Sequence, residues 1–321
     1  MPHRIASRRR IAASALVLWA AACSPGDRGS ERGPLVVYNA GSLALPIRAV
    51  LDSFSAATGI PYEQENAGSL ETARKMTELG KIPDVIALAD HEVFPALLVP
   101  EHTTWYVRFA RNRLVIAYTD RSRFAGEITP DNWHRILLRG RIETGRADPN
   151  LDPAGYRALL AMQLAGTHYE DPDLATRLFS AAPERNVRPK EVDLVALLQA
   201  GELDYVWQYE SVSRAAGLRY VRLPSAVDLG SPDDSAAYAS AVVRVVGKAI
   251  GDSIEVRGSP IVYGFSIPRD APHPKLARAF ASFMLGAGQH IMRGAHLPVM
   301  ERPALVGSGA PGEIVAATGA P

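Results

Sequence analysis

Two short segments near the start of the chain repeat one arrangement of small residues around a serine. The sequence AGSL occurs at 40–43 and again at 67–70, each time before a segment with helical periodicity. The unpaired amides and positive dipole end of a helix start favour a bound anion. Neither serine has a Lys or Arg beside it, so neutral donors would hold that anion. The pair therefore predicts a buried oxyanion site that includes Ser42 and Ser69.

Both serines also have a simpler interpretation. Ser is among the residues preferred at a helix N-cap, where its hydroxyl accepts from a backbone amide. Capping and anion binding use the same unpaired amides, so the two interpretations are compatible. The recurrence of the segment favours the binding role.

Three further polar residues are candidate ligand contacts, although each also has a purely structural interpretation. Asp152 precedes Pro153 at a predicted helix start, so an N-cap with Pro at N1 is the simplest interpretation and ligand contact is the alternative. Gln208 lies near the C-terminal end of a predicted strand, where α/β folds place ligands, although a solvated strand end is favoured without further information. Tyr238, in a polar segment, is equally ambiguous.

The elements that would position these residues alternate between strand and helix. Apolar spacing and turn residues predict strands at 35–38, 61–65, 84–88, 113–118, 204–209, 219–223 and 260–267, and helices at 45–58, 70–79, 130–138, 153–165, 192–200 and 274–292. This alternation predicts an α/β protein with parallel strands. We expect two lobes, with the chain crossing near Phe109–Arg113 and returning near Tyr263–Ser266.

The composition gives no support for nucleic-acid binding. The 321 residues are 47% apolar, carry a formal net charge of +1 and include no long run of either sign, so a substantial core is expected. The sequence has no nucleophile-elbow, metalloprotease or Walker motif, and its eight histidines are scattered. We therefore expect no enzyme and no cofactor.

The N-terminus indicates export. Residues 1–22 combine several arginines with an apolar run too short for an ordinary membrane-spanning helix, which is typical of a signal peptide. Cys23, the only cysteine, follows three alanines and resembles a bacterial lipoprotein cleavage site; a plain signal peptide with an incidental cysteine is the alternative. Residues 23–33 suit a flexible tether, and we expect 304–321 to be a disordered tail.

Six segments of the chain resemble the tungstate/molybdate-binding proteins of ABC transporters, of the archaeal type with bacterial relatives. They read VVYNAGSL, ENAGSLETARKMTELGKIPDVIALAD, WYVRFARNRLVIAYTD, DPAGYRALLAMQLA, RPKEVDLVALLQAGELDYVWQYESV and GSPIVYGFSIP. The resemblance covers about Leu35 to Pro303. It implies a two-lobe fold of the type II periplasmic-binding kind, with mixed sheets flanked by helices and an oxyanion in the cleft between the lobes. One lobe would comprise 34–110 and 264–303, and the other 111–263.

The resemblance also implies a function and a set of site residues. Ser42 and Ser69 would bind oxyanion oxygens, Asp152 would contact the metal centre of molybdate or tungstate, and Tyr238 matches the family's tyrosine. The chain would be a monomer on the outer face of the cytoplasmic membrane or in the periplasm, anchored by lipid at Cys23. It would deliver its ligand to the permease of an ABC transporter.

One position departs from the family. Gln208 stands where the family has a glutamate that joins the aspartate at the metal centre. An amide is a poorer metal ligand than a carboxylate, but its NH2 group can donate to an oxo group. We expect Gln208 to donate in this way and the anion to stay closer to tetrahedral, with Asp152 the only carboxylate nearby; substitution by Glu210 is the alternative. Three other functions stay open: binding of sulfate or another tetrahedral oxyanion, an exported hydrolase or transferase, and a sensor or adhesin lipoprotein that has the same fold but no role in transport.

Overall fold

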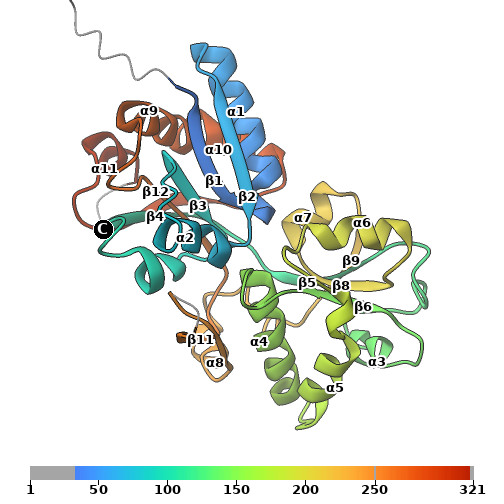
Figure 1. The fold of residues 1–321 in the computed structure, drawn as a ribbon. Coiled ribbons are helices and arrows are strands. Elements are labelled where there is room, and N and C mark those ends of the chain that lie inside the picture. The colour runs from blue at the N-terminus through green and yellow to red at the C-terminus, as the bar shows by residue number, and fades with distance from the viewer. Residues whose placement is uncertain (1–32, 249–250, 319–321) are drawn as a thin grey trace, which may run out of the picture. The chain divides into compact units, whose positions relative to one another are not determined.

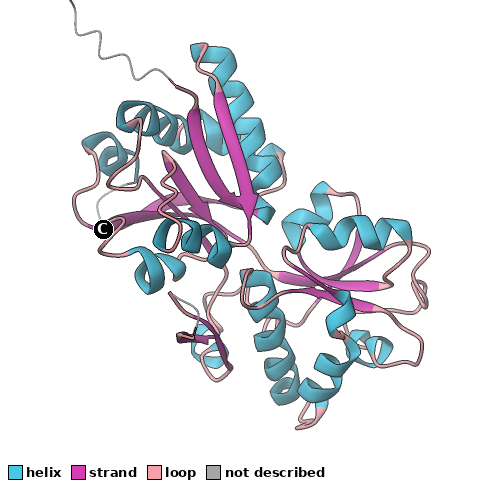
Figure 2. Ribbon diagram, viewed as in Figure 1, coloured by secondary structure: helices cyan, strands magenta, loops and turns pink. Residues whose placement is uncertain are grey.

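The computed structural model describes residues 33–248 and 251–318, which form two β-sheets flanked by helices (Figure 1). The expected signal peptide, Cys23 and most of the expected tether lie outside the described residues. No helix in the described ranges is long and apolar enough to cross a membrane. Figure 2 shows helices on both sides of each sheet, which confirms the predicted α/β class with two lobes.

The first lobe contains a six-stranded mixed sheet in the order β13-β4-β12-β3-β1-β2. Its strands are β1 (Leu35–Ala40), β2 (Tyr62–Ala67), β3 (Val85–Leu88), β4 (Trp105–Arg111), β12 (Val262–Ser266) and β13 (Val299–Gly307). The pairs of β1 with β2 and β3 are parallel, as predicted. In contrast, β12 pairs antiparallel with β3 and β4, and β13 pairs antiparallel with β4, so the sheet is not purely parallel.

Helices of the first lobe bury one apolar face each against this sheet or against each other. They are α1 (Ala44–Thr58), α2 (Ser69–Thr77), the π-helical turn η2 (Phe94–Leu98), α9 (Pro274–Leu285), α10 (Ala287–Gly294) and α11 (Gly312–Thr318). As predicted, α1 buries Ile47, Val50, Leu51 and Phe54 and ends at Gly59 in the left-handed conformation. The ring of Phe54 packs edge-on against Phe280 of α9.

The second lobe contains a five-stranded sheet in the order β7-β6-β8-β5-β9. Its strands are β5 (Leu114–Tyr118), β6 (Thr144–Ala147), β7 (Val187–Arg188), β8 (Tyr205–Tyr209) and β9 (Arg219–Arg222). Its helices are α3 (Trp133–Leu137), α4 (Pro153–His168), α5 (Leu174–Ala181), η3 (Glu184–Asn186), α6 (Asp193–Ala200) and α7 (Glu210–Ala215). The short helix α8 (Ser235–Tyr238) instead lies beside residues 253–257 (Figure 1). Here β5 is antiparallel to β8 and β9, and β6 is parallel to β8.

A two-stranded hairpin, β10 (Val242–Val246) and β11 (Ser253–Arg257), precedes β12 and contacts both lobes. The side-chain amide of Gln163 in α4 bonds both backbone polar groups of Val242, at 2.9 Å each. From α2 in the first lobe, Arg74 donates to the carbonyls of Val246 and Gly247. The hairpin therefore connects the two lobes on the path back to the first sheet.

The C-terminal segment differs from the expected disordered tail. Residues 304–307 belong to β13, where Leu305 pairs with Val107, and α11 follows them with Ile314 fully buried. The many Gly, Ala and Pro residues of this segment carry little apolar periodicity. Pairing with β4 and packing on α9 nevertheless fix it, which a local pattern cannot reveal.

Candidate functional site

The two AGSL turns lie side by side at one edge of the first sheet. Strands β1 and β2 are adjacent and parallel, with Ala40 directly opposite Ala67, so both turns leave the sheet at its C-terminal edge. Ser42 lies in the 3₁₀ turn η1 (Gly41–Leu43) before α1, and Ser69 is the first residue of α2. Sequence reasoning thus correctly grouped these residues, and the topology shows why they meet.

Neither serine caps its helix. The N-cap residue is Leu43 in α1 and Gly68 in α2, and neither residue makes a side-chain capping hydrogen bond. Instead, Ser42 Oγ accepts from the Tyr263 hydroxyl at 3.0 Å, and Ser69 Oγ accepts from the Ala89 amide at 2.9 Å. Because both oxygens act as acceptors in these bonds, each hydroxyl hydrogen is available to donate to a further oxygen.

Asp152 faces the second of these turns from the opposite lobe. It is the N-cap of α4, accepting from the Ala154 amide at 2.7 Å with Pro at the first helical position, which confirms the predicted cap. The carbonyl of the preceding Leu151 accepts from the first amides of α2, those of Leu70 and Glu71. The loop before α4 therefore closes directly on the N-terminus of α2.

Glycine is required at position 68 by this close approach. Its φ of −61° is open to any residue, but a Cβ there would lie 2.1 Å from the Leu151 carbonyl oxygen and 3.1 Å from the Asp152 Cα. Gly41 has a similar relation to the other lobe, because a Cβ there would lie 3.1 Å from Glu191 Oε2. Each small-residue turn thus lies against one acidic residue of the second lobe.

Glu191, shortly before α6, is a site residue that sequence reasoning missed. Its carboxyl group lies close enough to that of Asp152 for each to affect the ionisation of the other. Burial, followed by the neighbouring Asp152 charge, raises the pKa of Glu191 well above its usual range, and burial also raises the pKa of Asp152. The expectation that Asp152 is the only carboxylate nearby is therefore wrong. In the sequence, nothing distinguishes Glu191 from a surface acid before a helix.

Gln208 is fully buried rather than solvated at a strand end. Its Nε2 donates to the backbone carbonyl of Glu191 at 2.8 Å, and its Oε1 accepts from the Tyr209 amide at 2.8 Å. The Gln208 side chain thus fixes the backbone of Glu191. Glu210, the alternative carboxylate, is instead committed to ion pairs with Arg222 at 2.8 Å and with Arg113 at 3.4 Å.

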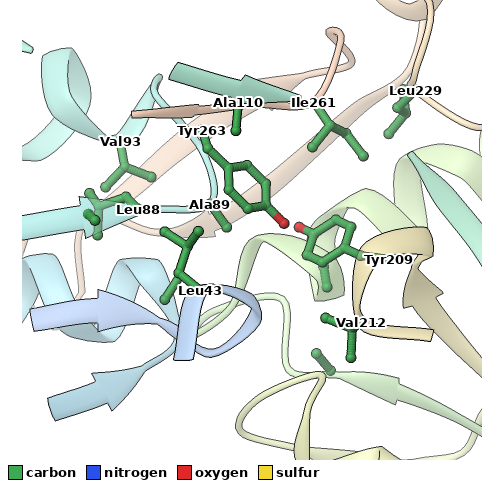
Figure 3. Packing of buried hydrophobic residues seen from close by; sticks show 14 of the residues in the cluster. Leu43, Leu88, Ala89, Val93, Ala110, Tyr209, Val212, Leu229, Ile261 and Tyr263 are labelled. Atoms are coloured by element: carbon green, nitrogen blue, oxygen red, sulfur yellow. The ribbon is translucent and has the colours of Figure 1, made fainter. Parts of the chain in front are cut away.

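Tyr238 is not joined to the other predicted residues by any hydrogen bond or ring contact of the described residues. Its hydroxyl donates to the Ser225 carbonyl and accepts from the Ser231 amide. Two other tyrosines occupy the site: Figure 3 shows the hydroxyls of Tyr209, from β8, and Tyr263, from β12, pointing toward one another. Their ring centroids lie 6.0 Å apart, edge to face.

A buried ion pair joins the lobes beside these tyrosines. Arg157 of α4 contacts Asp90, which follows β3, at 3.0 Å and donates to the Ala89 carbonyl at 2.8 Å and to the Tyr209 hydroxyl at 2.7 Å. Tyr156 donates to the same Asp90 carboxylate. Burial disfavours the charged guanidinium, but the Asp90 charge outweighs this effect and the pKa of Arg157 is raised.

Together these groups form an enclosed polar site between the lobes. Ser42, Ser69, Asp152, Glu191 and Gln208 are each 4% exposed or less. The first lobe supplies neutral hydroxyl donors and the second supplies two carboxyl groups. Within residues 33–248 and 251–318, no cluster of three or more His, Cys, Asp or Glu side chains could hold a metal ion. The arrangement suits a small, fully dehydrated anion that can accept hydrogen bonds and also bind carboxylate oxygen.

Comparison with known proteins identifies a family over most of the chain. Residues 35–297 match the family described as bacterial extracellular solute-binding protein. An uncharacterized solute-binding protein of Petrotoga mobilis is 44% identical over 84% of this chain and 85% of its own length. The molybdate/tungstate-binding protein WtpA of Pyrococcus abyssi is 34% identical over 93% of this chain and 95% of its own length.

Solved structures share the fold at low sequence identity. The periplasmic molybdate-binding protein of Azotobacter vinelandii aligns with a TM-score of 0.59 and 15% identity, over 83% of this chain and all of that one. The sulfate-binding protein SubI of Mycobacterium tuberculosis aligns with a TM-score of 0.60 and 13% identity, over 84% of this chain and 87% of that one. Both confirm the periplasmic-binding-protein fold.

Proposed function

The chain belongs to the bacterial extracellular solute-binding proteins, and on that premise we propose that it captures tungstate or molybdate outside the cytoplasmic membrane. The observation that carries this proposal is the pair of buried, non-capping serine hydroxyls at one sheet edge, facing carboxyl groups of the other lobe. The similarity to the molybdate/tungstate-binding protein of Pyrococcus abyssi supports the choice of ligand.

The chemistry of the opposite wall favours these anions over sulfate. A carboxylate facing a dianion repels it unless its oxygen binds the central atom directly. Tungsten and molybdenum can accept additional oxygen ligands, whereas the sulfur of sulfate cannot. Asp152 would supply such a ligand, while Ser42 and Ser69 donate to oxo groups and the amides near the helix starts add positive potential.

Delivery and anchoring complete the proposal. The loaded protein would hand its anion to the permease of an ABC transporter by opening its lobes, without covalent chemistry. The chain would act as a monomer tethered through a lipid on Cys23, at the outer face of the cytoplasmic membrane or in the periplasm. Mass spectrometry of the exported protein tests the anchor, because a lipid-modified Cys23 would be its first residue.

Calorimetry on the exported, purified protein with tungstate, molybdate and sulfate tests the ligand. We expect saturable heat with tungstate and molybdate and none with sulfate at the same concentration. The double variant Ser42→Ala/Ser69→Ala, whose serines cap no helix, should stay folded and lose the heat. Absence of binding heat with all three anions would refute the proposal. If sulfate bound more tightly than tungstate and molybdate, sulfate would be the ligand instead. Turnover of an ester or phosphate substrate would favour the hydrolase instead.

A further inference from the structure

A second polar cavity lies where the chain crosses from the first lobe to the second. Four arginines line it, and we call it the arginine pocket: Arg111, Arg113, Arg214 and Arg222. Its volume is about 550 Å³, which is within the range of small-molecule sites. We propose that the arginine pocket binds a small organic anion with at least two phosphate or carboxylate groups. This binding would not depend on which anion occupies the site between the lobes.

The arginine pocket holds more positive charge than its acids balance. Glu210 is the only acid among the described residues that line it. The Glu210 carboxylate is shared by three guanidiniums: Arg222 at 2.8 Å, Arg113 at 3.4 Å and Arg214 at 3.9 Å. Arg113 also contacts the buried Asp228 at 3.3 Å, whereas Arg111 forms no ion pair within the part of the chain that the structure describes. Because like charges in one cavity repel each other, a bound anion would stabilise this arrangement.

The arginines of the pocket come from both lobes. Arg111 is the last residue of β4 in the first lobe, and His296, which follows α10 in the same lobe, also lines the pocket. In the second lobe, Arg113 precedes β5, Arg214 lies in α7 and Arg222 ends β9. A guanidinium presents paired N–H donors that match one carboxylate or phosphate group. A ligand that contacts both lobes would therefore need at least two anionic groups.

Two buried polar residues, Asn112 and Ser211, also line the arginine pocket and are 5% and 3% exposed. The Nδ2 atom of Asn112 donates to Ser211 Oγ at 2.7 Å and to the Tyr263 hydroxyl at 2.9 Å. Its Oδ1 atom accepts from the Arg113 amide at 3.0 Å. These bonds fix the backbone where the chain crosses between the lobes, so the pocket is organised before a ligand binds.

The arginine pocket is separate from the site between the lobes. The residues of that site are absent from the described residues that line the pocket: Ser42, Ser69, Asp152, Glu191 and Gln208. Asn112 and Tyr263 stand between the two, because Asn112 donates to the Tyr263 hydroxyl, which in turn donates to Ser42. The protein would therefore hold one anion at each place at the same time.

Calorimetry on the exported protein with citrate and with pyrophosphate, at one fixed ionic strength, tests the arginine pocket. We expect saturable binding of at least one of the two anions. In Arg111→Gln/Arg214→Gln the affinity should fall at least about tenfold, while Glu210 keeps Arg222 and Arg113 as partners. The matched control is Arg185→Gln/Arg278→Gln, which removes the same charge from exposed arginines outside the pocket and should retain the affinity. Thermal denaturation of each variant confirms that it is folded.

The variant Ser42→Ala/Ser69→Ala distinguishes the two sites. It should bind citrate or pyrophosphate as the unaltered protein does, because neither serine is among the described residues that line the arginine pocket. Loss of binding in this variant would place the ligand between the lobes and overturn the proposal. Equal affinities in the two arginine variants, or no binding of either anion by the unaltered protein, would also overturn it.

Discussion

The side-chain amide of Gln208, in β8, donates a 2.8 Å hydrogen bond to the backbone carbonyl of Glu191, which lies between β7 and α6 in the same lobe. This bond links the end of β8 to the segment that leads into α6. It places a buried acid opposite the first lobe, where Gly41 leaves room for it. The acidic wall of the site is thus built from residues that are distant in sequence and joined through backbone atoms.

Gly68→Ala should prevent the lobes from closing. Its Cβ would lie 2.1 Å from the Leu151 carbonyl oxygen, which is backbone and cannot rotate away. We expect tungstate affinity to fall at least about tenfold, ~1.4 kcal/mol, and small-angle scattering to show a larger radius of gyration with ligand. Gly126→Ala is the control, because a Cβ there has no neighbour within 4 Å. Equal affinities for the two variants would contradict the role of close approach.

Arg157→Met should destabilise the protein strongly. It leaves the Asp90 carboxylate, 5% exposed at its side chain, without its ion-pair partner. Breaking a buried pair in this way costs about 3–5 kcal/mol of unfolding free energy, which urea denaturation can measure. The double variant Asp90→Asn/Arg157→Met removes the unpaired charge and should recover part of the loss. Absence of any recovery would show that Arg157 acts through packing rather than charge.

Stability of the ligand-free protein should fall as the pH rises. Burial raises the pKa of Asp152 and raises that of Glu191 well above its ordinary 4.5, so the folded protein binds more protons than the unfolded chain. The unfolding free energy then has a negative slope with pH: it is greatest below the unfolded pKa and decreases as the pH rises through the folded values.

Urea denaturation in steps from pH 4.5 to neutrality measures this slope. Glu191→Gln removes the group with the larger upward shift and should flatten the curve. Parallel curves for the two proteins would show that the carboxyl pair does not control the pH dependence.

Glu210→Gln should leave anion binding intact. Burial opposes ionisation of this carboxyl group, but the hydrogen bond from Arg222 and its charge outweigh burial, and the pKa of Glu210 is lowered. The glutamate thus forms ion pairs at the edge of the second sheet and is not part of the site. Calorimetry should show a change in tungstate affinity of less than about twofold. A larger loss of affinity would instead indicate that Glu210 contributes a carboxylate to the anion site.

Much of the first lobe could be predicted because its signals are local. The apolar face of α1, its end at Gly59 and the alternation with β1, β2 and β3 are all readable from periodicity and turn residues. The same reasoning grouped Ser42 with Ser69, since parallel neighbours end at one edge. Sequence periodicity could not show whether the two serines are helix N-caps, because this depends on the backbone conformation at the start of each helix.

The rest of the site depends on contacts that no local pattern contains. Glu191 becomes a site residue only because α4 brings Asp152 to it and β8 supplies Gln208. Tyr263 reaches Ser42 across more than two hundred positions of chain. Likewise, β13 is ordered by pairing with β4, although its own composition predicts a disordered segment.

The distribution of the hydroxyl and carboxyl groups over the two lobes has a consequence for release of a bound anion. Both hydroxyls belong to one half of the protein and both acids to the other. If the protein binds the oxyanion as proposed, separation of the lobes would remove the hydroxyl donors and the carboxyl groups from the anion in a single motion, and neither lobe would keep a complete set. A permease that receives the anion would then need no competing ligand and would only have to favour the open form of the protein.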